Sequence, residues 1–198
     1  MRILSFIYYL ITSFRNFLYD KGILPAKKVS DVEVICIGNI TVGGTGKTPA
    51  VQYFTKKLQK MGRKVAVVSR GYRGKRKREP LLVSDGREIF ATTRESGDEP
   101  FIHALNLKVP VIVSSNRYKG CLFAKKHFGV DTIVLDDGFQ HRKLSRDRDI
   151  VLIDATNPFG WGELLPKGML REDFKKAAKR ASEFIITKSD LVSDREVE

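Results

Sequence analysis

A glycine-rich loop between an apolar run and an amphipathic segment constrains the fold of this chain most. The run VEVICIGN (32–39) has the composition of a buried strand, TVGGTGKTP (41–49) follows it, and residues 47–61 then repeat apolar side chains at helical spacing. A strand, a glycine loop and a helix in this order are the context in which a phosphate-binding loop occurs. The sequence therefore predicts a nucleotide site at the end of a buried strand.

The residues of this loop suit a triphosphate and a metal ion. The usual pattern is G-x-x-x-x-G-K-[ST], and only its first glycine is missing, because Thr41 stands there. Lys47 is expected to reach the β- and γ-phosphates, and Thr48 to hold Mg²⁺. The backbone expected to wrap the phosphates is that of Gly43, Gly44, Thr45 and Gly46. The structural alternative is a glycine-rich turn without a ligand.

Apolar runs alternate with helical patterns along the rest of the chain. Further strands are expected at 64–71, 109–115, 131–138, 149–155 and 182–190, a hairpin at 79–93, and helices at 98–107, 116–128 and 172–181. This alternation predicts an α/β fold of the P-loop NTPase type, with a mostly parallel sheet and helices on both faces. We expect residues 23–198 to form this nucleotide-binding domain.

The first 22 residues have a different character. Their unbroken uncharged run, residues 3–14, is 12 residues long, whereas a transmembrane helix needs about 20. Apolar side chains follow one face at helical spacing, and Ser5, Thr12, Asn16 and Asp20 fall on the other. We expect residues 1–22 to be a membrane-associated helix lying in the interface, with Arg2 and Arg15 reaching headgroups. The alternative is an amphipathic helix that packs its apolar face on the core.

The charge of the chain restricts its partners. Lys and Arg number 36 against 23 Asp and Glu, which gives a net charge of 36 − 23 = +13. Such a surface favours polyanions: nucleic acid, an anionic membrane surface or a phosphorylated substrate. No recognition-helix or RNA-binding signature is present, so nucleic acid is not the expected partner. Cys36 and Cys121 lie in apolar runs and are expected to be buried, reduced thiols.

A pair of carboxylates closes another apolar strand. Asp136 and Asp137 end the run IVL in LDDGFQHRK. Acidic residues at the carboxyl end of a strand in this fold lie beside the phosphate site and hold Mg²⁺. The alternative is a solvated turn. Gln140 and His141 follow at once, as candidates to orient a nucleophile or contact a phosphate, or as structural residues.

The stretch SGDEP contains a third acidic candidate, Asp98. Gly97 is followed by two acidic residues, and Pro100 falls in the first turn of the expected helix, which is typical of a helix N-terminus. Spacing alone favours Asp98 as a helix cap. The functional alternative is a general base that takes a proton from an attacking hydroxyl group.

Arginines in three separate segments are candidates for binding phosphate. Arg70 and Arg73 belong to the basic run SRGYRGKRKRE, close to the carboxyl edge of an expected strand. Arg117 in SNRYKG and Arg171 in LLPKGMLRED are further candidates, because guanidinium groups bind phosphate through paired hydrogen bonds. A solvated loop is the alternative for the basic run.

One motif indicates a different nucleotide. TKSD (187–190) follows an expected strand, and GTP-binding proteins read guanine with [NT]KxD in that context. The companion pattern D-x-x-G is absent, because Leu135 stands where it requires Asp before Gly138. A membrane-associated P-loop GTP-binding protein therefore remains the alternative to an ATP-dependent enzyme.

Taken together, the motifs resemble one family. GNITVGGTGKTP, SRGYRG, SGDEP, SNRYKG, LDDGFQHRKL and LLPKGMLRE occur in this order in the tetraacyldisaccharide 4′-kinases, the lipid A 4′-kinases of Gram-negative bacteria. The resemblance extends to about residue 190. It implies a lipid kinase at the cytoplasmic face of the bacterial inner membrane. Such an enzyme transfers the γ-phosphate of ATP to the 4′-hydroxyl of tetraacyldisaccharide 1-phosphate, the lipid A precursor.

The resemblance also assigns roles to matching positions. It implies that Lys47 and Thr48 bind ATP and Mg²⁺, and that Asp98 is the catalytic acidic residue. It also implies that Asp136 and Asp137 serve the metal and nucleotide site, and that His141, Arg117 and Arg171 contact the substrate or the transition state. We therefore expect Asp98, Asp136 and His141 in the catalytic set, Asp137 at the metal, and Arg117 and Arg171 at the substrate, where the basic run adds Arg70 and Arg73. Members of the family continue into a second α/β domain, which supplies a histidine that supports the catalytic aspartate. The resemblance implies that this sequence is the N-terminal part and lacks that domain.

Overall fold

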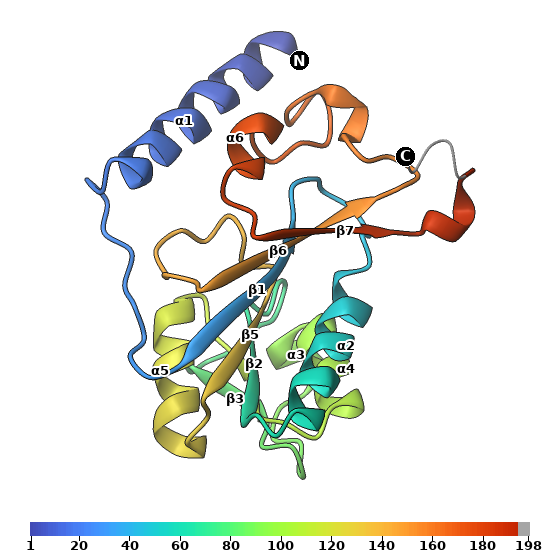
Figure 1. Cartoon of the computed structure of the whole chain (residues 1–198). Helices are drawn as coiled ribbons and strands as arrows, with labels where there is room; N and C mark the ends of the chain where they lie inside the picture. Colours follow the sequence, from blue (N-terminus) through green and yellow to red (C-terminus); the bar gives the residue numbers. More distant parts are fainter. Residues whose placement is uncertain (194–198) are drawn as a thin grey trace.

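One twisted sheet organises the chain, and the predicted glycine loop leaves its middle (Figure 1). The computed structural model describes residues 1–193; residues 194–198 of the predicted domain lie outside that range. The sheet contains β1 (Glu33–Asn39), β2 (Val65–Ser69), β3 (Leu81–Ser84), β4 (Val111–Val113), β5 (Thr132–Asp136), β6 (Arg148–Asp154) and β7 (Glu183–Thr187). Their order is β3-β4-β2-β5-β1-β6-β7, and only β3 runs antiparallel to its neighbour. The predicted mostly parallel α/β fold is confirmed.

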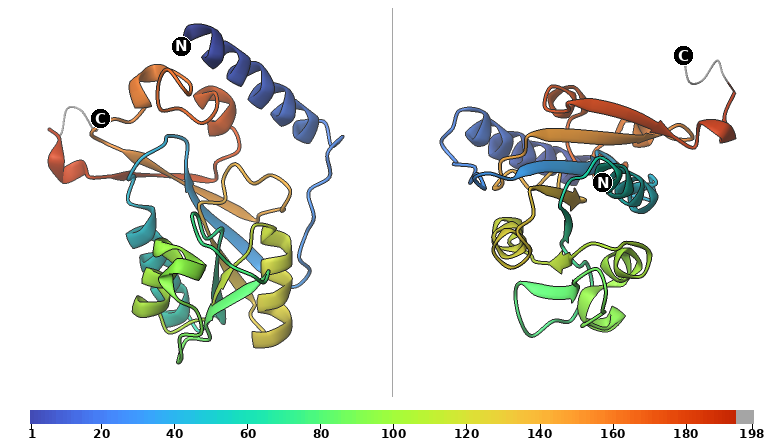
Figure 2. Two further views of the ribbon diagram at one scale, coloured as in Figure 1. Left: turned by 180° about the vertical axis from the view of Figure 1, so that it is seen from behind. Right: turned by 60° about the horizontal axis from the view of Figure 1, so that its bottom comes forward.

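Helices cover both faces of this sheet, as expected for a parallel sheet (Figure 2). They are α2 (Lys47–Lys60), α3 (Thr93–Ser96), α4 (Asp98–Asn106), α5 (Arg117–Phe128) and α6 (Phe174–Ala178), with 3₁₀ turns η1 (Gly160–Gly162) and η2 (Ser189–Leu191). Successive strand residues point to opposite sides, so Val34 and Cys36 join the core under α5 and α6, while Ile35 and Ile37 join the core under α2 and α4. Both cysteines are buried and free.

Several predicted boundaries change in the structure. The hairpin expected at 79–93 has one real strand, β3, whose end pairs with Ile89 through a single bridge. Asp85 accepts hydrogen bonds from the backbone of Arg87 and Glu88, which shapes the turn, and the chain then enters α3 at its N-cap, Thr92. The helix expected at 172–181 shortens to α6, because its N-cap is Asp173, whose side chain accepts from the Lys176 amide.

The N-terminal helix, α1 (Arg2–Asp20), packs on the protein with its polar face and exposes its apolar face. Its buried residues are the polar Ser5, Thr12 and Asn16, whereas eight large apolar side chains of the same helix are exposed: Ile3, Leu4, Phe6, Ile7, Leu10, Ile11, Phe14 and Phe17. The alternative in which α1 covers the core with its apolar face is therefore wrong. Within residues 1–193, no helix has both the length and the apolar character that crossing a bilayer requires.

The helix α1 lies beside the segment that ends in α6 (Figure 1), and hydrogen bonds from its polar side chains join the two. Ser5 Oγ donates to the Leu164 carbonyl at 3.1 Å, and the Tyr8 hydroxyl donates to the Arg171 carbonyl at 2.8 Å. Asn16 Nδ2 donates to Glu172 Oε2 at 2.8 Å. Residues more than 150 positions apart are thereby joined, and α1 lies over the same side of the molecule as the nucleotide loop.

Candidate active site

Hydrogen bonds from neighbouring strands hold the glycine loop in place without a ligand. Asn39 Nδ2 donates to Thr45 Oγ1 at 2.9 Å, and Thr187 Oγ1 donates to the Thr45 carbonyl at 3.1 Å. Gly46 precedes α2 with φ 78°, a left-handed conformation that glycine adopts without strain. The loop therefore presents the N-terminus of α2, with its free backbone amides, to an anion.

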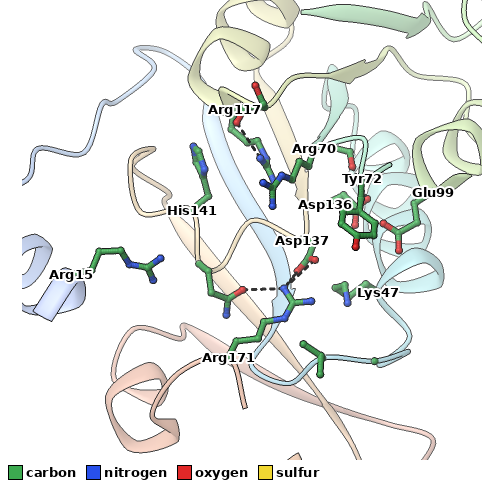
Figure 3. A pocket seen from close by; sticks show the side chains of 15 residues that line it. Arg15, Lys47, Arg70, Tyr72, Glu99, Arg117, Asp136, Asp137, His141 and Arg171 are labelled. Atoms are coloured by element: carbon green, nitrogen blue, oxygen red, sulfur yellow. Dashed lines mark hydrogen bonds and ion pairs between the residues drawn. The ribbon is translucent and has the colours of Figure 1, made fainter. Parts of the chain in front are cut away.

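A cavity of about 580 Å³ lies beside the loop, at the carboxyl ends of β1, β2 and β5 (Figure 3). Crevices at this edge of a parallel sheet are the usual ligand sites of α/β proteins. Its charged lining residues are Arg15, Lys47, Arg70, Glu99, Arg117, Asp136, Asp137 and Arg171; the others include Ser69, Tyr72, Gln140 and His141. Five permanent cations against three carboxylates favour a polyanionic ligand.

Asp136 is the most buried carboxylate of the cavity. It is 1% exposed, and its Oδ2 accepts a hydrogen bond from Ser69 Oγ at 3.0 Å and lies 3.4 Å from His103 Nε2 of α4. Its other oxygen, Oδ1, has no hydrogen-bond partner among the described residues. A buried carboxylate oxygen without a partner is costly, so this atom is suited to a cation or a bound water in the cavity.

Asp137 is held differently from its neighbour. Its carboxylate accepts from Arg171 Nη1 at 2.9 and 3.1 Å, and the same nitrogen lies 3.2 Å from Gln140 Oε1 (Figure 3). The residue has φ 50°, an uncommon backbone conformation for a side chain other than glycine. Asp137 and Arg171 form an ion pair at the cavity wall, in which each partner is available to a ligand of opposite charge.

Arg70 and Arg117 bring two guanidinium groups close together on the opposite wall (Figure 3). Arg117 is 5% exposed; burial lowers its pKa, and the charge of Arg70 lowers it further. Burial, followed by the positive charge of Arg117, lowers the pKa of His141 to about 4. His141 is therefore neutral at pH 7, and the two arginines form a preassembled site for a phosphate group.

Glu99 faces this positive wall from the N-terminus of α4 (Figure 3). Burial raises the pKa of its carboxyl group, and the nearby charge of Asp136 raises it further. Lys47, which is buried, acts in the opposite direction on the same group. A carboxylate with a raised pKa in a cavity is typical of a functional site.

Asp98 and Arg73 line a second, smaller cavity of about 260 Å³, together with Lys75 and Arg94. Tyr72 lines both cavities, which are therefore neighbours. Gly97, and not Asp98, is the N-cap of α4, and no side-chain hydrogen bond caps this helix, so the capping interpretation of Asp98 is wrong. Asp98 is exposed in this second cavity, and its catalytic role stays a prediction.

The structure therefore brings most predicted site residues together. Lys47, Arg70, Arg117 and Arg171 share the main cavity with Gly43, Asp136, Asp137 and His141. Gly44, Thr45 and Gly46 complete the loop, and Thr48 stands in the first turn of α2, outside the lining of the cavity. Asp98 and Arg73 are the two that lie apart.

Sequence reasoning missed three residues of the site. Arg15 was expected at the headgroups, but it points from α1 into the main cavity (Figure 3). Glu99 was overlooked beside Asp98, although adjacent helical residues point about 100° apart and only one could face the cavity. His103 follows Glu99 by four positions, so it lies on the same face of α4; that spacing was the available signal.

The donors in the cavity fit Mg²⁺ carried by a nucleotide. Among the residues that the structure describes, no group of three or more His, Cys, Asp or Glu side chains could hold a metal ion unaided. Mg²⁺ usually takes one or two carboxylates and completes its shell with phosphate oxygens and waters. The unpartnered Asp136 Oδ1, with Asp137 and the loop beside it, matches that donor set.

A parallel sheet, a phosphate-binding loop after its strand β1 and a carboxylate pair at the end of the adjacent β5 define a P-loop nucleotide-binding protein. Within that class, the model of one family, described as Tetraacyldisaccharide-1-P 4′-kinase (LpxK), matches residues 1–198. The chain belongs to this family, and the resemblance drawn from its motifs is confirmed.

Individual relatives agree with the family model. A "Tetraacyldisaccharide 4′-kinase" of Halothermothrix orenii is 46% identical over 195 residues, which cover 98% of this chain and 50% of that protein. A protein of the same name from Elusimicrobium minutum is 42% identical over 200 residues, and the match covers 99% of this chain and 53% of that protein. The chain spans about half the length of the curated relatives it matches.

A solved structure agrees as well. The crystal structure of an "apo" form of LpxK from Aquifex aeolicus in complex with ATP superposes with a TM-score of 0.87 at 42% sequence identity. The match covers 95% of this chain and 58% of that one. The similarity therefore extends over nearly the whole sheet and its helices.

Proposed function

We propose that this chain carries the nucleotide site of a kinase that transfers the γ-phosphate of ATP to the 4′-hydroxyl of tetraacyldisaccharide 1-phosphate. The observation that carries the proposal is the main cavity, which unites Lys47 of the phosphate loop with Asp136, Asp137 and a wall of arginines. The names of the relatives supply the acceptor, and the ATP of the Aquifex aeolicus complex supplies the donor.

The residues would divide the work of phosphoryl transfer. The 4′-oxygen attacks the γ-phosphorus, the bond from that phosphorus to the β–γ bridging oxygen breaks, and ADP leaves. Lys47 and the amides of the loop would stabilise charge on the β- and γ-phosphates. Mg²⁺, held by Thr48, Asp136 and Asp137 with the nucleotide, would neutralise part of the same charge. Arg70 and Arg117 would steady the transferred group or the substrate phosphate.

The proton of the 4′-hydroxyl requires an acceptor. Asp98 is exposed in the smaller cavity, which joins the main one at Tyr72. An acceptor sugar that spans the two cavities would place its hydroxyl between Asp98 and the γ-phosphate. His141 lines the main cavity and would contact the substrate. It would do so as a neutral imidazole, because its pKa is lowered to about 4. Asp98→Asn should lower transfer by about 10²–10⁴-fold, the usual contribution of a general base.

Transfer of γ-labelled phosphate tests the proposal. The chain is mixed with tetraacyldisaccharide 1-phosphate in detergent micelles, Mg²⁺ and either ATP or GTP. Label on the lipid from ATP, lost in Lys47→Ala, is the expected result. Binding of Mg·ATP without transfer would overturn the catalytic step for this chain. Binding and turnover of GTP alone would favour the alternative, a P-loop GTP-binding protein.

We further propose that α1 attaches the protein to an anionic membrane surface, at the cytoplasmic face of the bacterial inner membrane. The helix exposes its apolar face along its whole length while its polar face is hydrogen-bonded to the protein. A helix of this kind binds by inserting the apolar face among acyl chains, and the net charge of +13 would add attraction to anionic headgroups.

Vesicle sedimentation tests this attachment. The double variant Ile7→Ser with Phe14→Ser removes two exposed side chains of α1 and should strongly reduce binding to vesicles that contain phosphatidylglycerol. Tyr53→Ser is the control, because Tyr53 on α2 is 61% exposed, close to Phe14 at 64%. Equal binding by all three proteins would contradict the proposal.

A further inference from the structure

A short turn between β6 and α6 exposes two aromatic side chains that have no role so far. This aromatic turn, residues 159–162 with the sequence FGWG, contains η1. Phe159 is 48% exposed and Trp161 is 74% exposed, and neither lines the main cavity or the second, smaller one. Single exposed apolar side chains are ordinary on a protein surface. The surroundings of the turn therefore determine whether these two have a function.

The backbone of the aromatic turn is a fixed support for the exposed indole ring. Trp161 has φ 64°, in the left-handed region that bulky residues rarely adopt. Its amide donates to Asn157 Oδ1 at 3.2 Å. The turn is also packed tightly on the protein, because a Cβ added at Gly160 would lie 2.7 Å from Met169 Cβ. Residues held in such a conformation by their surroundings cluster at functional sites.

The aromatic turn lies beside the apolar face of α1. A groove of about 820 Å³ runs between them, and both Phe6 of α1 and Phe159 of the turn line it. Ser5 Oγ joins its two sides, because it donates to the Leu164 carbonyl and accepts from the Lys167 amide, each at 3.1 Å. In Figure 1, α1 and the orange segment between β6 and α6 lie at the same end of the molecule. Since Phe6 is also exposed, the apolar surface of α1 continues across the groove to the turn.

Basic residues stand at the border of this apolar surface. Arg2 and Lys175 line the groove and are exposed. The two carboxylates of the same lining are already engaged, since Glu163 pairs with the ammonium group of Lys167 and Asp173 caps α6. An apolar surface with a basic border is complementary to a bilayer that carries anionic headgroups.

We propose that the aromatic turn is a second membrane contact of this protein, in which the indole ring of Trp161 enters the headgroup region of an anionic bilayer beside α1. Tryptophan is enriched at this depth because its ring is apolar while its N–H can still form a hydrogen bond. A single helix lying on a bilayer leaves the protein free to rock about the helix axis, and a second contact to one side prevents this. The inference rests on the proposed attachment of α1 to the membrane.

This contact would also orient the active site, because the aromatic turn is joined to the phosphate loop. Met169, which packs on Gly160, accepts a hydrogen bond from the Val42 amide through its carbonyl at 2.8 Å. The neighbouring Leu170 forms a bridge with Thr41. The main cavity would thereby be held at one height and one tilt relative to the bilayer that contains the proposed substrate.

Intrinsic fluorescence tests the contact directly, because Trp161 is the only tryptophan of the chain. The protein is mixed with vesicles of equal parts phosphatidylethanolamine and phosphatidylglycerol, without substrate. The emission maximum should move to shorter wavelength, and lipids brominated near the headgroup should quench the emission more than lipids brominated near the chain ends. Unchanged emission from protein that sediments with the vesicles would overturn the contact and leave the attachment by α1 intact.

Sedimentation of variants measures the contribution of the ring. Trp161→Asn, which suits the left-handed backbone, should weaken binding to these vesicles by about tenfold, because partial burial of an aromatic ring is lost. Trp161→Phe should restore most of the binding, since it keeps an apolar ring. Phe90→Asn is the control, because Phe90 is 53% exposed beside the hairpin turn that packs on Val109, at the amino end of β4. Equal binding by Trp161→Asn and wild type would contradict the proposal.

The remaining outcomes separate this contact from the proposed function. Trp161→Asn should bind Mg·ATP as tightly as wild type, because the aromatic turn lines neither cavity of the site. A change of emission with Mg·ATP alone, and none with vesicles, would mean that the ring stacks on the nucleotide and would overturn the membrane contact. Wild-type protein that shows the fluorescence shift but binds no Mg·ATP would remove the kinase proposal and leave the contact standing. Wild-type protein that does not sediment with vesicles would remove both the attachment by α1 and the contact.

Discussion

His103 illustrates how much of the site depends on residues without an obvious motif. The side chain is fully buried, neither ring nitrogen has a hydrogen-bond partner by geometry among the described residues, and its nearest charged atom is Asp136 Oδ2 at 3.4 Å. Ser69 Oγ approaches the same oxygen from β2. Asp136 is thus fixed from two elements through Oδ2, while its Oδ1 has no hydrogen-bond partner among the described residues.

His141 should make stability depend on pH. Its folded pKa of about 4 lies below the ordinary value of 6.5, chiefly through burial. Between these values the unfolded chain binds more protons, so this contribution is present above pH 6.5 and is lost as pH falls toward 4. Urea denaturation should show that the free energy of unfolding differs less between pH 7 and pH 5 in His141→Asn than in wild type. His127→Asn, which alters an exposed histidine of α5, should keep the full difference.

Gly71 should tolerate no side chain. It has φ +66°, and an added Cβ would lie 2.3 Å from Val113 Cγ1 and 2.6 Å from the Ser96 carbonyl. Gly71→Ala should lower the free energy of unfolding by about 3 kcal/mol or more, from backbone strain and overpacking together. Gly62 has φ +81° with nothing within 4 Å, so Gly62→Ala should cost only about 1 kcal/mol. If denaturant titrations showed the same loss of unfolding free energy in Gly71→Ala and Gly62→Ala, the clash of the added Cβ at position 71 would be relieved by local rearrangement, which would contradict the prediction.

The sequence predicted which residues belong to the site better than it predicted which way their side chains point. Lys47, Asp136 and Asp137 were predictable, because they follow strands or lie in a loop whose position is set by the backbone. Glu99 and Asp98 are neighbours on α4, and which of them faces the main cavity depends on the rotation of that helix. Arg15 depends on how α1 docks, a contact with residues more than 100 positions away.

Among the elements, α1 departs most from ordinary packing. Its apolar residues recur at helical spacing, so the helix itself was predictable. Such a face usually packs on the core, and here the polar face does so, through hydrogen bonds to residues 164–172. The strands of the sheet, by contrast, were predictable nearly to their ends, because buried parallel strands are continuous apolar runs.

Because α1 packs with its polar face, we expect truncation of a polar side chain of this helix to destabilise the fold more than truncation of an apolar one. Asn16→Ala should lower the free energy of unfolding by about 1–2 kcal/mol, because it removes a hydrogen bond to the buried carboxylate of Glu172. Phe17→Ala should change it by less than about 0.5 kcal/mol, because the ring is half exposed. Urea titrations in the absence of detergent measure both. A larger loss in Phe17→Ala would mean that the apolar face packs on protein.

For the molecule as a whole, ligand binding should be visible as stability. A nucleotide that binds only the folded state at about 100 times its dissociation constant adds about 2.7 kcal/mol. For a chain of this size that corresponds to a rise in Tm of about 5–10 °C. Thermal unfolding monitored by circular dichroism with Mg·ATP should show this shift, and Lys47→Ala should show much less. A matching rise with MgCl₂ and sulfate alone would mean that any anion suffices.

The order of strands in the sheet was the part of the fold that local sequence could not supply. Alternating runs indicate how many strands there are, but not which of them lie side by side. β3 runs antiparallel to β4, from which α3 and α4 separate it in the sequence, and β1 pairs with β5 and β6, which lie about a hundred residues downstream.

The position of β1 also has a consequence for biosynthesis. Its partners on both sides, β5 at residues 132–136 and β6 at residues 148–154, are encoded about a hundred residues downstream. A ribosome adds roughly 5–20 residues per second, so the strand that precedes the nucleotide loop is made about 5–20 s before the two strands that flank it. A nascent chain that has not yet released residue 154 therefore lacks a strand that flanks β1, and its phosphate loop lacks the sheet that positions it.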